Sequence, residues 1–472
     1  MPYEPKIIAY LCTWCSYTGA DTAGIARLKS PANIRDIRVP CSGRVSPEII
    51  MRTFEQGADG VLVLGCHIGE CHYNTGNHRA AKRLPVLQAL LAYAGLEPTR
   101  VRLDWVSASE GERFSRIANE FTETVRALGP IQWKIADRNT RFVWQQEPVS
   151  HRYSAFSDEQ PKHAVYFTPV HEQQTQAIRA SAAELLANKQ VDCVIGYEVG
   201  PRGRTRPAFV HQAEDADRLV WNQDCTHNLT AYLSKKLGWG TDGGKKKQPD
   251  RLPKAAVVVK PCDSRSINVM LAENRFLREQ VNIIGVACDG IRQGAGFNDE
   301  KSGAIQTRCA ACKVRTPVVY DALIGEPDTT YREIPPEHIY PGIDHLDAMT
   351  PPERMEFWLS QFDRCIRCYA CRQACPMCDC PICLYERDDS LWVGMGIDVD
   401  EKRAYHLGRA YHLAGRCVGC NECERACPMD IPLSLIHRKM AQEMETIFGF
   451  QAGMAAVPPP FVTILGGEEN LP

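Results

Sequence analysis

The sequence lacks the features that would place it in several large functional classes. It contains no apolar run approaching the length of a membrane span, and its beginning, MPYEPKIIAY, lacks the charged and long apolar regions of a signal peptide. The 55 basic and 57 acidic side chains nearly cancel, leaving a formal net charge of −2, so bulk charge points to neither nucleic acid nor an anionic membrane. We therefore expect a cytoplasmic protein that binds no nucleic acid.

Motifs of hydrolytic and nucleotide-binding sites are also missing. The chain has no nucleophile elbow, no H-E-x-x-H and no P-loop, and its acidic residues show no spacing that demands acid–base catalysis. No clear G-x-G-x-x-G follows an expected strand, since GIRQGAGF is rich in glycine but has other spacing. We therefore expect no hydrolytic active site.

Cysteine, by contrast, is abundant, at 22 of 472 residues. Cytosolic thiols stay reduced, so cysteines at this density are expected to bind metal rather than to form disulfides. Eight of them form two runs of the pattern C-x2-C-x2-C-x3-C-P, at residues 365–376 and 417–428. This is the run of bacterial two-cluster ferredoxins, in which the fourth cysteine of each run binds the cluster of the other run.

The expected ligands of two [4Fe-4S] clusters follow from that exchange. Two-residue spacers let three thiolates of one loop reach three irons, and the proline after the fourth cysteine turns it toward the neighbouring loop. The two sets are Cys365, Cys368, Cys371 and Cys427, called set A below, and Cys417, Cys420, Cys423 and Cys375, called set B. The alternative is a pair of structural zinc sites, which would need only four ligands each, usually from two C-x2-C pairs.

Residues 1–145 alternate short apolar runs with amphipathic segments, which predicts a small doubly wound α/β domain. Buried parallel strands are expected at residues 6–11, 34–39, 60–64 and 100–106, and helices at 47–56 and 77–94.

Five cysteines follow the first three of these strands, at the carboxyl edge where open parallel sheets place their sites. They are Cys12, Cys15, Cys41, Cys66 and Cys71. Their spacing does not choose between a binuclear and a cubane cluster. The neighbouring His67 and His72 are candidate nitrogen ligands, although a histidine beside a metal site more often packs or orients a ligand.

The motifs around these cysteines resemble the delta subunit of methyl-viologen-reducing hydrogenase. The likeness extends over residues 5–130 and is carried by CTWCSYTGADTAGIAR, VPCSGRVSP, GADGVLVLGCHIGECHYNTGN and SASEGERF. It implies a [2Fe-2S] cluster on four of the five cysteines, with the spare one undetermined. It also implies partners, because that subunit couples a hydrogenase or formate dehydrogenase to the flavin subunit of heterodisulfide reductase.

Residues 146–350 are expected to form a second α/β domain, with strand-like runs in HAVYFTP, VDCVIGYEVG, KAAVVVK and VNIIGVA. Four cysteines follow strands or lie in the C-x2-C loop RCAACK, and they could share one further [4Fe-4S] cluster. They are Cys262, Cys288, Cys309 and Cys312, called set C below. Alternatively, the first two are merely buried thiols and the last two are half of a zinc or redox site. Basic side chains surround these loops and either hold a phosphate, influence a cluster or lie idle at the surface: Arg265, Arg308, Lys313 and Arg315.

This region, joined to the ferredoxin-like runs, resembles the beta subunits of deazaflavin-coenzyme-reducing hydrogenases and related formate dehydrogenases. The likeness is carried by KPCDSR, IIGVACDG, RCAACK and RCIRCYACRQACP. It implies a bound flavin, FAD, that exchanges hydride with the coenzyme and passes single electrons to clusters. Because the chain has no dinucleotide fingerprint, FAD binding is inferred from the resemblance alone.

Residues 351–450 are expected to form the dicluster ferredoxin-like domain, and 451–472 a proline-rich tail that binds a partner. Between the two runs, residues 401–416 are predicted to form an amphipathic helix lying over that domain.

The remaining cysteines fall into two groups. Cys378, Cys380 and Cys383 crowd behind the first run and either join Cys309 or Cys312 in an extra cluster or stay partly unused. Cys193 and Cys225 stand alone and are expected to be ordinary core thiols.

Three cysteine-rich modules in series predict a conduction path for single electrons. We expect an iron–sulfur relay between the catalytic subunit of a formate dehydrogenase or hydrogenase and a heterodisulfide-reductase-like flavoprotein, in an anaerobic redox complex. Two alternatives remain: a flavin-containing oxidoreductase acting on a deazaflavin or nicotinamide coenzyme, and a zinc-stapled assembly scaffold.

Overall fold

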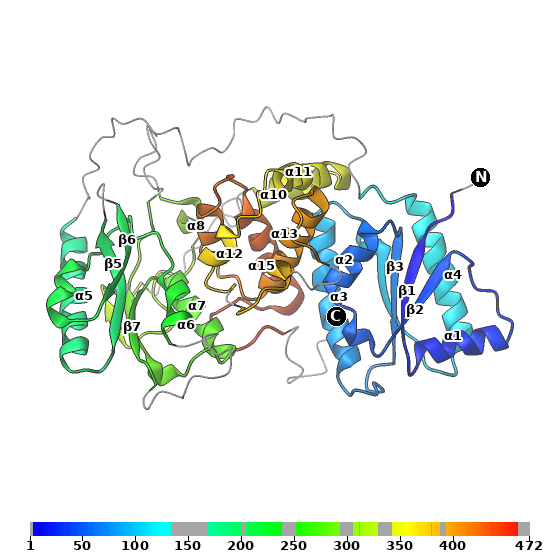
Figure 1. The fold of residues 1–472 in the computed structure, drawn as a ribbon, viewed down its shortest axis with the longest axis horizontal. Coiled ribbons are helices and arrows are strands. Elements are labelled where there is room, and N and C mark those ends of the chain that lie inside the picture. The colour runs from blue at the N-terminus through cyan, green and yellow to red at the C-terminus, as the bar shows by residue number, and fades with distance from the viewer. Residues whose placement is uncertain are drawn as a thin grey trace.

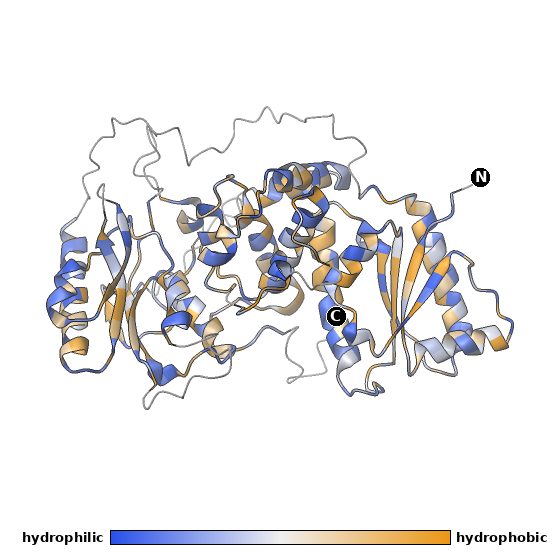
Figure 2. Cartoon of the chain, in the orientation of Figure 1, coloured by the Kyte–Doolittle hydropathy of each residue, from blue (hydrophilic) through white to orange (hydrophobic). Residues whose placement is uncertain are grey.

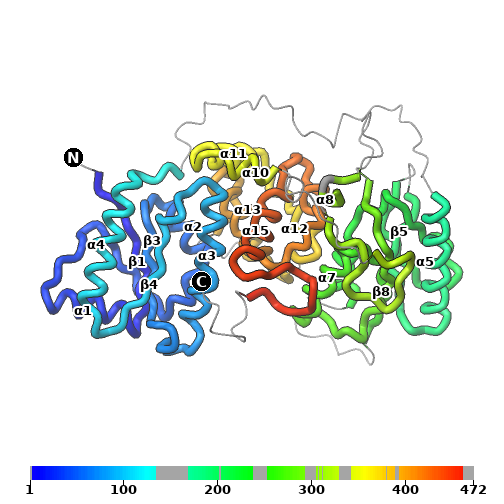
Figure 3. The backbone as a smooth tube through the Cα atoms, turned by 180° about the vertical axis from the view of Figure 1, so that it is seen from behind, coloured from blue at the N-terminus to red at the C-terminus, as the bar shows by residue number. Residues whose placement is uncertain are grey.

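The three parts of the molecule lie in a row, in an order that differs from their order along the chain. The computed structural model describes residues 3–133, 168–200, 204–237, 252–292, 305–310, 312–328, 342–378, 380–387 and 393–460. An α/β unit lies at each end, and the helical module formed by the last part of the sequence lies between them (Figure 1). The view from behind shows the same arrangement (Figure 3).

The N-terminal unit is a parallel sheet of four strands in the order β2-β1-β3-β4. The strands are β1 (Ile7–Cys12), β2 (Ile34–Val39), β3 (Gly60–Gly65) and β4 (Val101–Trp105). One face packs against α1 (Ser16–Ile25) and α4 (Gly111–Leu128), the other against α2 (Pro47–Glu55) and α3 (Gly76–Tyr93). The six elements expected from the sequence are confirmed to within one residue at each end.

Alternation along the strands separates the two faces of this sheet. Ile7, Ala9 and Leu11 of β1 pack toward α1 and α4, whereas Tyr10 packs toward α2 and α3. The apolar colour of the sheet between bluer helices is plain in Figure 2. The expectation that residues 34–39 form a buried strand is wrong. β2 pairs on one side only, and Arg35 and Arg38 face solvent, as is common for charged residues on an edge strand.

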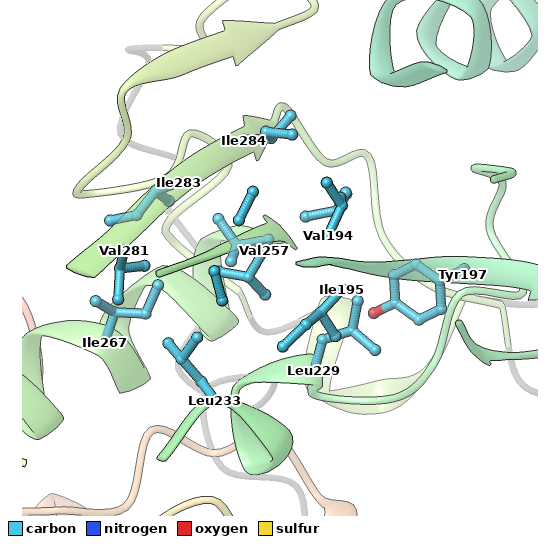
Figure 4. Packing of buried hydrophobic residues seen from close by; sticks show 14 of the residues in the cluster. Val194, Ile195, Tyr197, Leu229, Leu233, Val257, Ile267, Val281, Ile283 and Ile284 are labelled. Carbon is cyan, nitrogen blue, oxygen red and sulfur yellow. The ribbon is translucent and has the colours of Figure 1, made fainter. Parts of the chain in front are cut away.

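The second unit is a mixed sheet in the order β6-β5-β7-β8-β9. Its strands are β5 (Cys193–Val199), β6 (Thr205–Val210), β7 (Ala255–Val259), β8 (Val281–Val286) and β9 (Ala322–Ile324), with only β6 antiparallel to its neighbour. Helix α5 (Pro169–Ala187) covers one face, and α6 (Leu233–Lys236) and α7 (Pro261–Ala272) lie on the other (Figure 1). Figure 4 shows the core, where Ile195, Val257 and Ile283 pack with Leu229 and Ile267.

The helical module contains seven helices besides short 3-10 turns in the part of the chain that is described. They are α8 (Thr307–Ala310), α10 (Ile343–Ala348), α11 (Pro351–Asp363), α12 (Ala370–Ala374), α13 (Val399–Leu413), α14 (Glu422–Arg425) and α15 (Leu433–Phe448).

The expectation that residues 401–416 form an amphipathic helix covering the module is wrong. The helix, α13, is buried on all sides from Lys402 to Tyr411, because it lies between the cysteine loops and the N-terminal unit. Its packing is tight: a Cβ added at Gly408 would come within 1.5 Å of the Tyr385 hydroxyl. A helix with this position has no solvent face to present.

The middle module shares a hydrophobic core with the N-terminal unit. Leu407, Ile436 and Met440 pack in one cluster with Leu87 and Leu90 of α3. Polar contacts reinforce it, since His412 Nε2 lies 2.6 Å from Glu48 Oε1 and Arg403 Nη1 donates to the Trp133 carbonyl at 2.5 Å. The two parts are therefore packed together rather than merely tethered.

The module is equally bound to the second unit. Arg275 Nη1 donates to the Pro376 carbonyl at 2.9 Å, and Asn268 Nδ2 donates to the Gly453 carbonyl at 3.0 Å. Met377 and Val418 of the module lie in the core of the second sheet. The domain boundaries at 145 and 350 stay predictions, and residue 145 lies outside the described residues, as do the expected lysine-rich loop at 240–250, nearly all of HAVYFTP and most of the tail. Within the described ranges, no helix combines the length and apolarity needed to span a bilayer.

The shared core can be tested at Trp358 of α11, which is 1% exposed and lies 5.6 Å, centroid to centroid, from Tyr93 of α3. We expect W358A to lower the free energy of unfolding by about 3–5 kcal/mol through lost burial and a residual cavity. Thermal unfolding measures the loss, and faster limited proteolysis of the N-terminal unit shows that it loosens. I25A, at a residue 85% exposed, is the control. An unchanged melting temperature in W358A would contradict the shared core.

Candidate metal centres

The five N-terminal thiols meet at the carboxyl edge of the first sheet. The Cys12 and Cys66 sulfurs are 3.6 Å apart, and those of Cys41 and Cys71 are 3.7 Å apart. Cys15 hydrogen-bonds to Cys66 and is close enough to Cys12 and Cys71 for their charges to act on its thiol. The structure thus brings together all five residues that the sequence singled out.

Local backbone geometry fixes this edge. Strands β1 and β3 are neighbours although helices leave them on opposite faces, so Cys12 and Cys66 lie at the switch point of the sheet. The Ser16 hydroxyl ties the two strand ends, accepting from the Cys12 N–H at 2.7 Å and donating to the Leu64 carbonyl at 2.8 Å.

Gly76, the first residue of α3, makes room for two of the sulfurs. A Cβ at this position would lie 2.1 Å from Cys41 Sγ and 3.3 Å from Cys71 Sγ. Backbone N–H groups of Tyr73, Gly76 and Asn77 donate to the Cys71 sulfur. This is a cradle built to hold sulfur close to backbone donors, as expected for a cluster ligand.

The thiols at this edge need a cation to become thiolates. Burial raises the pKa of Cys66 well above its usual value and that of Cys41 to about 11. For Cys71 burial acts in the same direction, but the backbone donors outweigh it and lower the pKa. Because metal binding requires the thiolate, iron would supply the positive charge that burial withholds.

The two candidate histidines have other partners. His67 Nε2 lies 2.6 Å from Glu110 Oε2, and that carboxylate also accepts from the Ser107 N–H. His72 stacks on Trp14 with ring centroids 3.7 Å apart. Both contacts are those of a histidine that packs beside a metal site rather than binding the metal.

The two ferredoxin-like runs adopt the same local conformation. In each, the residue two after the first cysteine has positive φ, at Arg367 (54°) and Gly419 (72°), and its N–H donates to the first cysteine sulfur at 3.3 and 3.4 Å. A second pair, Tyr369 and Asn421, has φ of 59° and 57° and begins α12 and α14. Repeated positive φ at non-glycine residues is a strained conformation retained where loops must present ligands.

The fourth cysteines cross over between the runs. Cys365 lies within electrostatic reach of Cys368, Cys371 and, from the other run, Cys427.

The second set is assembled in the same way. Cys423 is close to Cys417 and Cys420, and Cys375 of the first run is close to Cys420. This is the arrangement expected for sets A and B, and their ligation of iron stays a prediction.

Set C also gathers in one place. Cys288, whose pKa burial raises to about 11, is within electrostatic reach of Cys309 and Cys312, and Cys262 is within reach of Cys288. The Ile291 N–H donates to Cys309 Sγ at 3.4 Å. Four thiols from two strand ends and one loop therefore line one site.

Set C lies against set B. Arg308, beside Cys309, donates through Nη1 to the Cys420 carbonyl, and the charges of Cys262, Cys309 and Cys420 all raise its pKa against the effect of burial. The two centres thus share one guanidinium, and the idle-surface alternative for Arg308 is wrong.

The other basic residues divide in their contacts. Arg315 is buried and donates to the carbonyls of Cys309 and Cys288 at 3.1 and 3.4 Å. Arg265 donates to the Ala452 carbonyl at 3.0 Å and so holds the C-terminal segment. Lys313 is half-buried.

The crowded cysteines behind the first run lie next to set B. Cys378 hydrogen-bonds to Cys375, Cys383 lies close enough to feel the charge of Cys378, and Cys380 is exposed. The lone thiols Cys193 and Cys225 are buried in the core of the second unit, 4% and 0% exposed, as expected of ordinary core thiols.

The sulfur positions suit multinuclear clusters. Within the described ranges, no three His, Cys, Asp or Glu side chains converge on a point that one metal ion could occupy. The ligands of an iron–sulfur cluster each contact a different iron or share one iron in pairs, and so they lie further apart. The paired sulfurs at the N-terminal edge and the fourfold sets elsewhere fit this pattern.

Sequence reasoning missed several residues that the fold brings to these centres. The Tyr405 hydroxyl lies 3.3 Å from Cys371 Sγ, and Arg409 Nη2 donates to the Cys371 carbonyl at 3.0 Å. Both come from α13, whose position between the cysteine loops and the N-terminal unit no local pattern announces. Gly76 was visible in the quoted motif only as a glycine.

Comparison with known proteins concerns the N-terminal unit. Residues 7–129 match the family described as methyl-viologen-reducing hydrogenase, delta subunit. The D-type iron-sulfur subunit of the F420-non-reducing hydrogenase of Archaeoglobus profundus is 48% identical over 132 residues, which are 28% of this chain and 96% of that protein. Its counterpart in the vhc F420-non-reducing hydrogenase of Methanococcus voltae is 47% identical over 132 residues, 28% of this chain and 92% of that protein.

A similar segment occurs inside a larger protein. The A-type subunit of the ferredoxin/F(420)H(2)-dependent CoB-CoM heterodisulfide reductase of Methanosarcina acetivorans is 50% identical over 127 residues, which are 27% of this chain and 16% of that protein. The same kind of unit is thus found alone and joined to other parts.

The cradle at the N-terminal edge is testable by G76A. The added methyl would overlap Cys41 Sγ, so we expect loss of the N-terminal centre with the other centres retained. Iron content and EPR of the reduced protein measure this. The control is G24A in α1, where a Cβ meets nothing within 4 Å. Equal iron content and signals in G76A and wild type would contradict the cradle.

Proposed function

The chain belongs to the methyl-viologen-reducing hydrogenase delta-subunit family through residues 7–129, and from this premise we propose that it is an iron–sulfur electron-transfer subunit. It relays electrons between the catalytic subunit of a hydrogenase or formate dehydrogenase and a heterodisulfide-reductase-like flavoprotein. The relatives named above are parts of a hydrogenase and of a heterodisulfide reductase, which supports both kinds of partner.

The observation that carries this proposal is the convergence of cysteines into sets that adjoin one another. Sets A and B exchange their fourth cysteines, and Arg308 joins set C to set B. Clusters in series pass one electron at a time, with potentials set by ligands, hydrogen bonds to sulfur and exposure. Neighbouring clusters in one polypeptide therefore form a path rather than separate sites.

We assign the clusters by these sets. Sets A, B and C would each hold a [4Fe-4S] cluster, and four of the five N-terminal thiols a [2Fe-2S] cluster. Cys378 and Cys383 lie beside set B, where they could carry an extra centre or serve as alternative ligands.

The spatial order gives each end unit its own role. Because the ferredoxin-like module lies in the middle, an electron entering at either α/β unit would cross the module to reach the other (Figure 1). Fusion into one chain fixes the donor and acceptor ends, replacing a docking equilibrium with a high effective concentration.

Iron and acid-labile sulfide analysis of anaerobically purified protein tests this function. We expect about ten iron atoms per chain from the N-terminal centre and sets A and B, and about four more from set C. EPR of the reduced protein should separate the binuclear from the cubane signals. Near-stoichiometric zinc without sulfide would overturn the proposal, and flavin released by acid together with coenzyme reduction would favour the oxidoreductase alternative.

The exchange of fourth cysteines is tested by pairing variants. Because Cys375 lies with Cys420, C375S should remove the same EPR signal as C420S, and C427S the same signal as C368S. Each should lower the iron content by about four atoms. C193A, at a core thiol of β5, should change neither signal. If C375S instead matched C368S, each run would hold its own cluster and the exchange would be wrong.

A further inference from the structure

Arg409 is a buried cation lying between sets A and B. It projects from the middle of α13 and is 4% exposed. Its Nη2 donates to the carbonyl of Cys371 in set A at 3.0 Å, and its Nη1 lies 3.0 Å from His437 Nε2 on α15. Tyr405, one turn earlier on the same helix, places its hydroxyl 3.3 Å from Cys371 Sγ.

The charges around Arg409 are cysteine sulfurs of both sets. Burial acts to lower its pKa, but Cys378, Cys371, Cys375 and Cys423 outweigh burial and keep it charged. Cys371 belongs to set A and Cys375 and Cys423 to set B, so one guanidinium faces both.

No carboxylate balances this charge. Among the residues that the structure describes, Arg409 forms no ion pair with Asp or Glu, in contrast to Arg403 on the same helix, whose Nη2 lies 2.8 Å from Asp400. His437 cannot balance it either, because burial and Arg409 itself lower the pKa of that imidazole well below its usual value. A buried charge is retained only where an opposite charge compensates it, and the thiolate-bound centres are the anions at hand.

We propose that Arg409 is a positioning residue that raises the reduction potentials of the centres at sets A and B together, by holding one positive charge between them. This inference rests on the proposed function, since it requires clusters at both sets. One-electron reduction of either cluster adds a negative charge beside the guanidinium, so the cation stabilises the reduced form. The electron comes from the neighbouring cluster or, in the test, from an added low-potential reductant.

The position also couples the two centres. When one cluster is reduced, its added charge offsets part of the guanidinium charge felt by the other, so the second reduction becomes harder. The cation therefore favours passage of single electrons over storage of two in the module.

An EPR-monitored redox titration of full-length protein tests this, after iron and sulfide analysis has shown equal loading. In R409M the ratio of reduced to oxidised cluster at a fixed potential should fall about tenfold or more for both signals, which corresponds to about 59 mV for one electron. R409K keeps the charge on a shorter side chain, so it should restore most of the shift. R403M removes a buried cation from the same helix, away from the sulfurs, and should leave both potentials unchanged.

Each outcome decides something. A wild-type protein without cubane signals would overturn the proposed function, whereas loaded R409M with wild-type potentials overturns this inference alone. A shift of equal size in R403M would also overturn it, because the effect would then be general to helix charge. If R409M cannot be loaded, R409Q takes its place, since it removes the charge but keeps a hydrogen-bond donor. A lower reduced fraction for both signals in R409Q supports the shared cation, and wild-type potentials contradict it.

Discussion

The structure depends on thiols that are buried together where none of them could carry its charge alone. Burial raises the pKa of Cys66, Cys288 and Cys420, so these side chains become anions only when a cation joins them. In the function we propose, iron is that cation. The strained loops around Arg367 and Tyr369, the missing side chain at Gly76 and the backbone donors to sulfur all serve to hold thiolates at fixed positions.

The same requirement explains the placement of the last module. Its cysteine loops are small and poor in apolar residues, so they cannot bury a core of their own size. They are enclosed instead by the two α/β units, through the cluster that joins α13 and α15 to α3 and through the contacts of Arg275 and Asn268. The centres are thereby shielded from water and brought next to one another, which an electron path needs.

Much of this could be predicted from the sequence, for reasons that are local. The parallel strands of the first unit follow from β-branched runs, and the clustering of its cysteines follows from their place after strands, a rule of sheet topology. The pairing of Cys365 with Cys427 follows from a repeated motif. What failed was long-range. The solvent-facing edge at Arg35, the burial of α13 and the middle position of the last module depend on which surfaces pack together, and no periodicity within a segment encodes that. Arg409 was missed for the same reason, since its importance comes from two loops distant in sequence.

Anomalous scattering at the iron edge, from crystals grown without oxygen, tests the central claim most directly. The account predicts iron peaks inside the five-thiol edge and within sets A, B and C, with Cys427 bonded beside Cys365 and Cys375 beside Cys420. Peaks that appear only at the zinc edge, or thiols of these sets bonded to no metal in protein of full iron content, would contradict it.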